Sequence, residues 1–310
     1  MAQRNNLVLV TGATGTQGGA AAREMLAAGF PVRVLSRNPG GAAAQALARL
    51  GAEVVQGDYE DLPSLESACR GAAGVFSVQR PDADGSDSER RHGFALIEAA
   101  RKAGTRHFVH TSVCEAGKHA SFPRWESGYW YQKYWTDKWD IEERVRAAGF
   151  ERWTVLKPAF MMDNYAEPKA ERMFPQLRQG EILTAFPPDT RLQLIAGDDV
   201  GAFARAALVE PARFDRQNID LAAEALTMTE VAAILSRHCS RPVRARSATP
   251  KEVKAAGQFP GWVRTQEWIG EVGYRADIGA LAPWGVALTS FDSWVQQHRA
   301  SIRIECGSRI

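Results

Sequence analysis

The chain has 310 residues, of which 45% are hydrophobic, so it can bury a large core as one large domain or two fused ones. Its 38 Lys and Arg nearly balance its 36 Asp and Glu, so it lacks the basic excess of proteins that bind nucleic acid or an anionic membrane. No stretch approaches the ~18 apolar residues of a membrane span, and no signal peptide opens the chain. With four scattered cysteines, we expect a cytoplasmic protein.

Short apolar runs alternate with helical patterns through the first half of the chain. Uninterrupted apolar runs are typical of parallel strands that are buried on both faces, and strict alternation with helices indicates βαβ units. Residues 1–158 are therefore predicted to form an α/β, Rossmann-type, doubly wound parallel sheet. We expect strands near 7–10, 32–35, 53–56, 74–78, 107–110 and 153–156, and helices over 17–28, 41–50, 62–70, 88–103 and 130–148.

Beyond residue 158 the pattern is mixed. Residues 159–310 are expected to form a smaller C-terminal α/β lobe that binds the substrate. The boundary is soft, because such lobes exchange segments with the main domain. Helices are expected near 198–209, 227–239 and 250–256, and strands near 192–195, 218–221 and 243–245.

A glycine-rich turn follows the first expected strand and opens the first expected helix. Its glycines, Gly12, Gly15 and Gly18, stand at i, i+3 and i+6. In a dinucleotide-binding turn the first glycine lets the chain leave the strand, the second admits the pyrophosphate, and the third lets the helix pack closely. The helix N-terminus then faces the phosphates. Because a strand precedes it and a helix follows, we favour this interpretation over an ordinary glycine-rich turn.

The end of the second strand distinguishes NAD from NADP. An acidic residue there binds the ribose 2′-hydroxyl, whereas an arginine meets a 2′-phosphate. The sequence has Arg37 and no acid, which favours NADP(H) over the alternative of a solvated surface arginine. Asp58 follows the third strand, where a side chain can reach the adenine edge, although aspartate is equally common as a turn residue.

These residues resemble the NmrA-like group of atypical short-chain dehydrogenases/reductases. The similarity covers roughly the first two thirds of the chain, through segments 10–19, 34–39, 56–58, 156–164 and 197–201. The group includes reductases of quinones, azo compounds and isoflavones, and also NADP(H)-responsive sensors and corepressors that need not turn over substrate. The resemblance implies NADP(H) binding through Arg37 and through the loop residues Gly12, Thr14, Gly15, Thr16, Gln17 and Gly18.

Tyr134 and Lys138 form a Tyr-x-x-x-Lys pattern on the long aromatic-rich helix. The i, i+4 spacing places both side chains on one face, where the ammonium is expected to lower the pKa of the phenol. Tyr134 would then exchange a proton while hydride moves, and Lys138 would hold the nicotinamide ribose. The alternative is that these residues belong to an aromatic core or subunit interface. In much of the resembling group the tyrosine is replaced and the lysine is kept.

A third catalytic member, a serine after the fifth strand, is doubtful. By the register of dehydrogenases with a full Ser-Tyr-Lys set, that position falls near Val113, and Ser112 would point to the opposite face. Thr111 is a substitute. Val78, at the end of the fourth strand, is expected to line the nicotinamide side, and Phe160 to pack on the ring or, alternatively, in the core.

Aromatic segments at 125–131 and 262–268 are expected to be loops that either roof a substrate pocket or form the surface of a homodimer. The sequence therefore predicts an NADP(H)-dependent oxidoreductase that passes hydride to a flat conjugated acceptor. The alternative is a non-catalytic NADP(H) sensor, and a weaker one is a sugar- or isoprenoid-modifying dehydrogenase. No metal is implied, because no ligand spacing connects His92, His107, His110 and His119.

Overall fold

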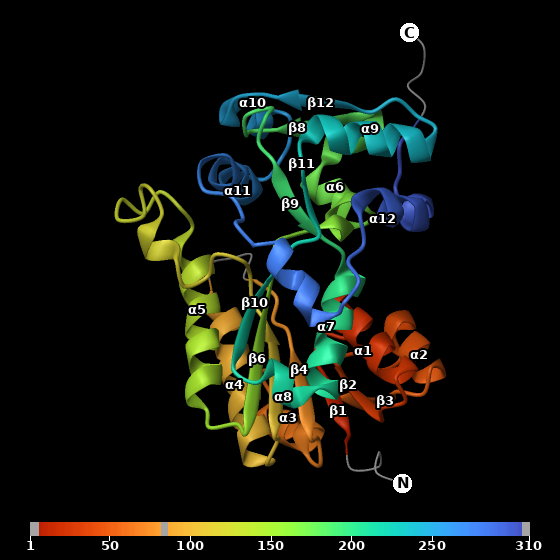
Figure 1. The fold of residues 1–310 in the computed structure, drawn as a ribbon, viewed down its shortest axis with the longest axis vertical. Coiled ribbons are helices and arrows are strands. Elements are labelled where there is room, and N and C mark those ends of the chain that lie inside the picture. Colours follow the sequence, from red (N-terminus) through yellow and green to blue (C-terminus); the bar gives the residue numbers. More distant parts are fainter. Residues whose placement is uncertain (1–5, 82–85, 306–310) are drawn as a thin grey trace. The chain divides into compact units, whose positions relative to one another are not determined.

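The computed structural model describes residues 6–81 and 86–305, and within it the chain divides into two compact units (Figure 1). The first unit takes the chain up to residue 117 together with residues 133–158 and 197–221. The second takes residues 118–132, residues 159–196 and the chain from residue 222 on. The chain thus crosses between the units five times, after residues 117, 132, 158, 196 and 221. The boundary predicted at residue 158 is one of these crossings.

The first unit is built on a seven-stranded sheet in the order β10-β6-β5-β4-β1-β2-β3. All paired strands run parallel, which confirms the predicted doubly wound α/β fold. Strand order reverses between β1 and β4, and ligands of open α/β sheets bind at such a switch point, beyond the carboxyl ends of the strands. The strands are β1 (Val8–Val10), β2 (Val32–Ser36), β3 (Glu53–Gln56), β4 (Gly74–Ser77), β5 (His107–Thr111), β6 (Arg152–Pro158) and β10 (Gln217–Leu221).

Helices cover both faces of this sheet (Figure 1). On one face, apolar side chains of α3, α4 and α5, among them Leu65, Leu96 and Ile141, form a buried cluster with Leu9 and Phe108 of the sheet. On the other face α1 packs closely against α7. The helices are α1 (Thr16–Ala27), α2 (Ala42–Arg49), α3 (Leu62–Cys69), α4 (Ser88–Lys102), α5 (Gln132–Ala147), α7 (Gly197–Val209) and α8 (Pro211–Phe214).

Two predicted elements of the C-terminal lobe belong instead to the first unit. The strand expected near 218–221 is β10, which pairs with β6 in the main sheet, and the helix expected near 198–209 is α7. Their own sequences carry the correct periodicity. Pairing between strands that are far apart in the chain cannot be read from that periodicity, so the sequence located the elements, and the soft boundary left open the exchange of segments between the two units.

The second unit contains a three-stranded sheet, β11-β9-β7, and a two-stranded sheet, β12-β8. Capping boxes begin two of its helices: the Thr227 and Thr249 hydroxyls accept from the backbone N–H of Glu230 and Glu252. The strands are β7 (Phe160–Met161), β8 (Glu181–Thr184), β9 (Leu192–Ile195), β11 (Glu224–Leu226) and β12 (Arg244–Ser247). The helices are α6 (Lys169–Met173), α9 (Met228–Cys239), α10 (Pro250–Ala255), α11 (Pro260–Glu271) and α12 (Phe291–His298).

The expectation of a loop at 262–268 was wrong, because these residues lie inside α11. Pro260 stands at the first position of this helix, where its missing N–H costs nothing, and one face of the helix buries Trp262, Val263 and Trp268. Short 3-10 turns occur at His119–Ser121, Met162–Tyr165, Pro175–Gln179, Gly279–Trp284 and Arg299–Ser301. In the part of the chain that the structure describes, no helix has the length and apolar character needed to cross a bilayer.

Candidate functional site

The turn after β1 needs glycine at two of its positions for steric reasons. Gly12 has φ of +60°, in the left-handed region, and a Cβ there would stand 2.5 Å from Cγ1 of Val78. At Gly18 a Cβ would stand 2.4 Å from the carbonyl oxygen of Gly12. Helix α1 can therefore seat directly against the turn only because these residues lack side chains. This agrees with the roles predicted for the first and third glycines.

The second glycine of the turn is less crowded than the other two and lies at the start of α1. A Cβ on Gly15 would meet only the Gly12 carbonyl oxygen, at 3.3 Å. Gly15 is also the N-cap of α1, and no side chain caps this end. The first N–H groups of a helix need partners, and an anionic group at the N-terminus provides them. The buried Oε1 of Gln17 likewise has no hydrogen-bond partner within the described chain, while Thr14 is exposed.

Arg37 lies just beyond the end of β2 and is exposed. Within residues 6–81 and 86–305 its guanidinium has neither a hydrogen bond nor an ion pair, whereas the backbone N–H of the next residue, Asn38, donates to Ser36 Oγ at 3.2 Å. The turn is thus ordered while the cation stays available. A planar guanidinium in this position can bind a phosphate with two parallel hydrogen bonds.

Asp58 follows β3, and its carboxylate belongs to a local turn. Its Oδ1 accepts from the backbone N–H of Glu60 at 3.0 Å, and its own N–H donates to Ser64 Oγ at 3.1 Å. This geometry supports the alternative of a turn aspartate. Next to it, the Tyr59 hydroxyl donates to the carbonyl oxygen of Val78 at 3.0 Å, and burial raises the pKa of Tyr59 to about 12. Tyr59 thereby ties the turn after β3 to the segment after β4.

A buried polar group lies at the carboxyl ends of β4 and β5, next to the switch point. Gln79 Nε2 donates to Ser77 Oγ at 3.0 Å, and Ser77 Oγ lies 3.2 Å from Nδ1 of His110. Gln79 Oε1 and the hydroxyl of Thr111 are buried without a partner in the described chain. Buried polar atoms are seldom left unpaired, so these atoms fit the polar groups of a dinucleotide. Gln79 follows Val78 in the segment 75–79, which ends the fourth predicted strand and was expected to line the nicotinamide side.

Tyr134 and Lys138 lie together on α5, as the spacing predicts, and Lys138 Nζ stands 5.1 Å from the centre of the Tyr134 ring. The ammonium, however, is bound by Glu89 of α4, with Nζ 2.7 Å from Oε1. Burial, and then the charge of Glu89, raise the pKa of half-buried Tyr134 well above its usual range. The expectation of a lowered phenol pKa was therefore wrong, because the burial of Tyr134, and then the nearby charge of Glu89, raise it.

The hydroxyl of Ser112 is engaged by Glu142 of α5, one turn beyond Lys138. This hydroxyl donates to Glu142 Oε1 at 2.6 Å, in a buried network with Arg146 and Lys157. Val113 occupies the place expected for a catalytic serine and is itself buried. Among the candidates for that role, Thr111 is the one whose hydroxyl is left without a partner in the described chain.

Phe160 lies in β7 of the second unit, inside an aromatic core. Its ring stacks on Trp262, with centroids 5.5 Å apart, and packs edge-on against Tyr165 and Phe174. This arrangement supports the core alternative for Phe160. Nearby in the same unit, segment 118–132 is fastened to α11 through Tyr129, whose ring lies between the guanidinium groups of Arg124 and Arg264.

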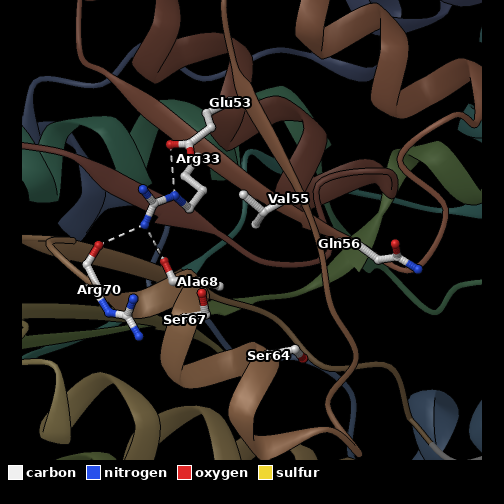
Figure 2. A pocket seen from close by; sticks show the side chains of 8 residues that line it. All are labelled: Arg33, Glu53, Val55, Gln56, Ser64, Ser67, Ala68 and Arg70. Carbon is white, nitrogen blue, oxygen red and sulfur yellow. Dashed lines mark hydrogen bonds and ion pairs between the residues drawn. The ribbon is translucent and has the colours of Figure 1, made fainter.

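A polar hollow of about 210 Å³ opens between β3 and α3 (Figure 2). Arg33 closes one side of it by donating to Glu53 and to the carbonyl oxygens of Ala68 and Arg70, so its guanidinium is already paired. The lining residues of the hollow are Arg33, Glu53, Val55, Gln56, Ser64, Ser67, Ala68 and Arg70, none of which was predicted to bind the dinucleotide.

The sheet, the glycine turn and the free arginine define a dinucleotide-binding α/β protein of the Rossmann type. The chain belongs to the NmrA-like family, whose model matches residues 4–280, and this confirms the predicted resemblance. It is 33% identical over 238 residues to a (4-alkanoyl-5-oxo-2,5-dihydrofuran-3-yl)methyl phosphate reductase of Streptomyces griseus subsp. griseus, covering 77% of this chain and 76% of that one. It is 29% identical to an NAD(P)H azoreductase of Xenophilus azovorans, covering 81% and 80%.

Solved structures share the fold at lower identity. The NADPH-dependent quinone oxidoreductase QOR2 of Escherichia coli, crystallised with NADPH, superposes with a TM-score of 0.73 at 22% identity, covering 94% of this chain and 99% of that one. NmrA, a negative transcriptional regulator crystallised with NADP, also superposes with a TM-score of 0.73, at 19% identity, covering 96% and 98%. These likenesses confirm the fold class.

Proposed function

We propose that this protein is an NADPH-dependent reductase that passes hydride to a flat conjugated acceptor such as a quinone, azo compound, enone or cyclic imine. The observation that carries the proposal is the Tyr134–Lys138 pair on α5, in the same unit as the glycine turn. A phenol beside a buried ammonium is a proton donor of the kind that hydride transfer needs. The absence of a serine at Val113 favours an acceptor that needs little help beyond hydride and a proton.

The residues of the first unit fit the polar parts of the cofactor. The N–H groups at the start of α1 would hold the pyrophosphate, with Gly15 leaving the space, and Arg37 would bind the 2′-phosphate. The unpartnered atoms of Gln17, Gln79 and Thr111 would take up its remaining polar groups. When bound, the reduced nicotinamide supplies the hydride. The NAD(P)H azoreductase and the quinone oxidoreductase in the same comparisons support this choice of cofactor.

The chain's own groups would then divide the work. Lys138, held by Glu89, would orient the nicotinamide ribose, and Tyr134 would give its hydroxyl proton to the acceptor. Val78 would line the nicotinamide face. That the protein is cytoplasmic and that it forms a homodimer remain predictions from the sequence.

A redox sensor is the second candidate. The observation that favours a sensor is the similarity to NmrA, a negative transcriptional regulator. At 19% identity this similarity is one of fold. Relatives named as reductases stand nearer in sequence, at 29% and 33% identity, and cover three quarters or more of both chains. Reductases and sensors share this fold, so the fold cannot discriminate between the two classes. The residues of the site have to distinguish a reductase from a sensor.

The test is NADPH consumption by the purified protein against a quinone, an azo dye, an enone and a cyclic imine. We expect turnover that falls roughly 10²-fold or more in kcat/KM in Lys138→Ala, and by about 10²- to 10⁴-fold in Tyr134→Phe if the phenol is the proton donor. Lys102→Ala, an exposed lysine of α4 paired with Glu66, is the matched control and should keep full activity. Tight NADPH binding with no turnover on any acceptor would support the sensor.

A further inference from the structure

Glu89 is a carboxylate that the fold buries. It lies in the first turn of α4, and its side chain is 3% exposed. A buried carboxylate is costly unless it is paired and hydrogen-bonded. Its partner is Lys138, which reaches across from α5 with its own side chain 8% exposed and Nζ 2.7 Å from Oε1. The two helices are therefore linked at this point by a dry ion pair.

The pair lies against the face of a tyrosine. Lys138 Nζ stands 5.1 Å from the centre of the Tyr134 ring, one turn away on the same helix. Without Glu89, an ammonium at this distance would stabilise a tyrosinate. With the carboxylate present, the nearest charges sum to zero, so nothing in this pair favours loss of the hydroxyl proton.

The other titratable groups around Tyr134 and Lys138 in the first unit do not change this balance. From β5, His110 is held neutral, because burial and the charge of Lys138 lower its pKa to about 3. From the segment after β5, Cys114 stays a thiol, because burial raises its pKa. On α5 itself, Lys133 and Asp137 pair with each other. Glu89 is thus the carboxylate that balances Lys138.

We propose that Glu89 is a positioning residue that holds Lys138 and keeps the hydroxyl of Tyr134 protonated, so that the resting site holds a proton for the acceptor. This rests on the proposed function. In the reduction the acceptor gains a hydride from the reduced cofactor and a proton from Tyr134 Oη, and the tyrosinate that remains recovers a proton from the solvent.

The first measurement needs no turnover and no change at Glu89. The chain has six tyrosines, and their ionisation is followed by ultraviolet absorbance in wild type and in Tyr134→Phe. The two proteins should titrate alike up to about pH 11, because Tyr134 stays protonated there. A tyrosine that ionises below about pH 10 in wild type and is missing from Tyr134→Phe would overturn the proposal.

The second measurement changes the charge. In Glu89→Gln the ionisation of Tyr134 should move down by about 1 to 3 pH units, because Lys138 is no longer balanced. Glu89→Asp should keep it high. Glu98→Gln, an exposed glutamate of the same helix paired with Arg101, is the control and should leave the titration unchanged. An unchanged Tyr134 titration in Glu89→Gln would overturn the proposal.

A variant that leaves Lys138 unbalanced can fail to fold. The double variant Glu89→Gln with Lys138→Gln removes both charges. If Glu89→Gln alone fails to fold and the double variant folds, Glu89 is shown directly to balance Lys138. NADPH binding, followed by fluorescence, is measured on every variant that folds. Because neither the titration nor the binding involves an acceptor, failure of this inference is distinguishable from failure of the reductase proposal.

Discussion

The guanidinium of Arg37 lies exposed just beyond the end of β2 and has no partner in the described part of the chain. In the proposed site it is therefore available to a 2′-phosphate. The ammonium of Lys138 is instead held by Glu89, 2.7 Å away and 49 positions earlier in the chain.

Arg37→Ala should weaken NADPH binding and leave NADH binding unchanged, because only NADPH carries the 2′-phosphate. Loss of charge-assisted hydrogen bonds to phosphate costs about 1.5 to 3 kcal/mol, or roughly 10- to 100-fold in Kd. Fluorescence titration with both cofactors measures it. Arg49→Ala, an exposed arginine at the end of α2, is the matched control. Equal weakening for NADH and NADPH would mean that Arg37 does not read the 2′-phosphate.

Helix α1 is the element on which the proposed cofactor site depends. Its N-terminus is seated by the contact of Gly18 with the Gly12 carbonyl, whereas a Cβ on Gly15 would approach the same oxygen only to 3.3 Å. Gly18 therefore permits the packing of the protein, and we propose that Gly15 leaves room for the pyrophosphate.

The two glycines should separate in experiment. Gly18→Ala forces a Cβ to within 2.4 Å of a backbone oxygen. The overpacking should lower the free energy of unfolding by about 1 to 3 kcal/mol and should also abolish NADPH binding. Gly15→Ala meets that oxygen at 3.3 Å and should change stability little while abolishing NADPH binding. Urea unfolding and fluorescence titration measure the two effects. If Gly15→Ala binds NADPH normally, the pyrophosphate does not lie at this end of α1.

On the scale of the whole molecule, the sheet of the first unit encloses two neutral histidines on β5. His107 Nε2 lies 3.1 Å from Thr154 Oγ1 on the adjacent strand, and His110 contacts Ser77. Burial lowers the pKa of His107 to about 4 and that of His110 to about 3 from the ordinary 6.5. The folded protein therefore resists protonation at both sites, whereas the unfolded chain does not.

Stability should consequently fall as the pH drops below 6.5. Above that value neither state binds the protons, and the full stability is present. Between 6.5 and about 4 the unfolded chain takes up protons that the folded chain refuses, at about 1.4 kcal/mol per pH unit for each histidine. Urea unfolding at about pH 7.5 and about pH 5 should differ by roughly 2 kcal/mol per histidine. His107→Gln should reduce this difference by about half, and equal stability at both pH values would contradict it.

The features of this protein that depend on neighbouring residues in the chain were predicted from its sequence. The alternation of apolar runs with helical patterns predicted the parallel sheet, because a strand covered on both faces needs apolar residues throughout. The spacing of Gly12, Gly15 and Gly18 predicted the turn, because the strand, the turn and the helix that this pattern requires follow one another directly in the chain. Arg37 was found because the end of a strand has a known geometry.

Only the tertiary structure decided what depends on partners far apart in the chain. In the structure, β10 belongs to the main sheet, residues 262–268 lie in a helix, and Phe160 lies in an aromatic core. It also buried Tyr134 and brought Glu89 to Lys138, and the burial and the charge of Glu89 raise the pKa of Tyr134 that was expected to be lowered. Strand pairing, burial and charge balance are properties of neighbours in space. A sequence pattern reports periodicity along one segment and leaves those neighbours undetermined.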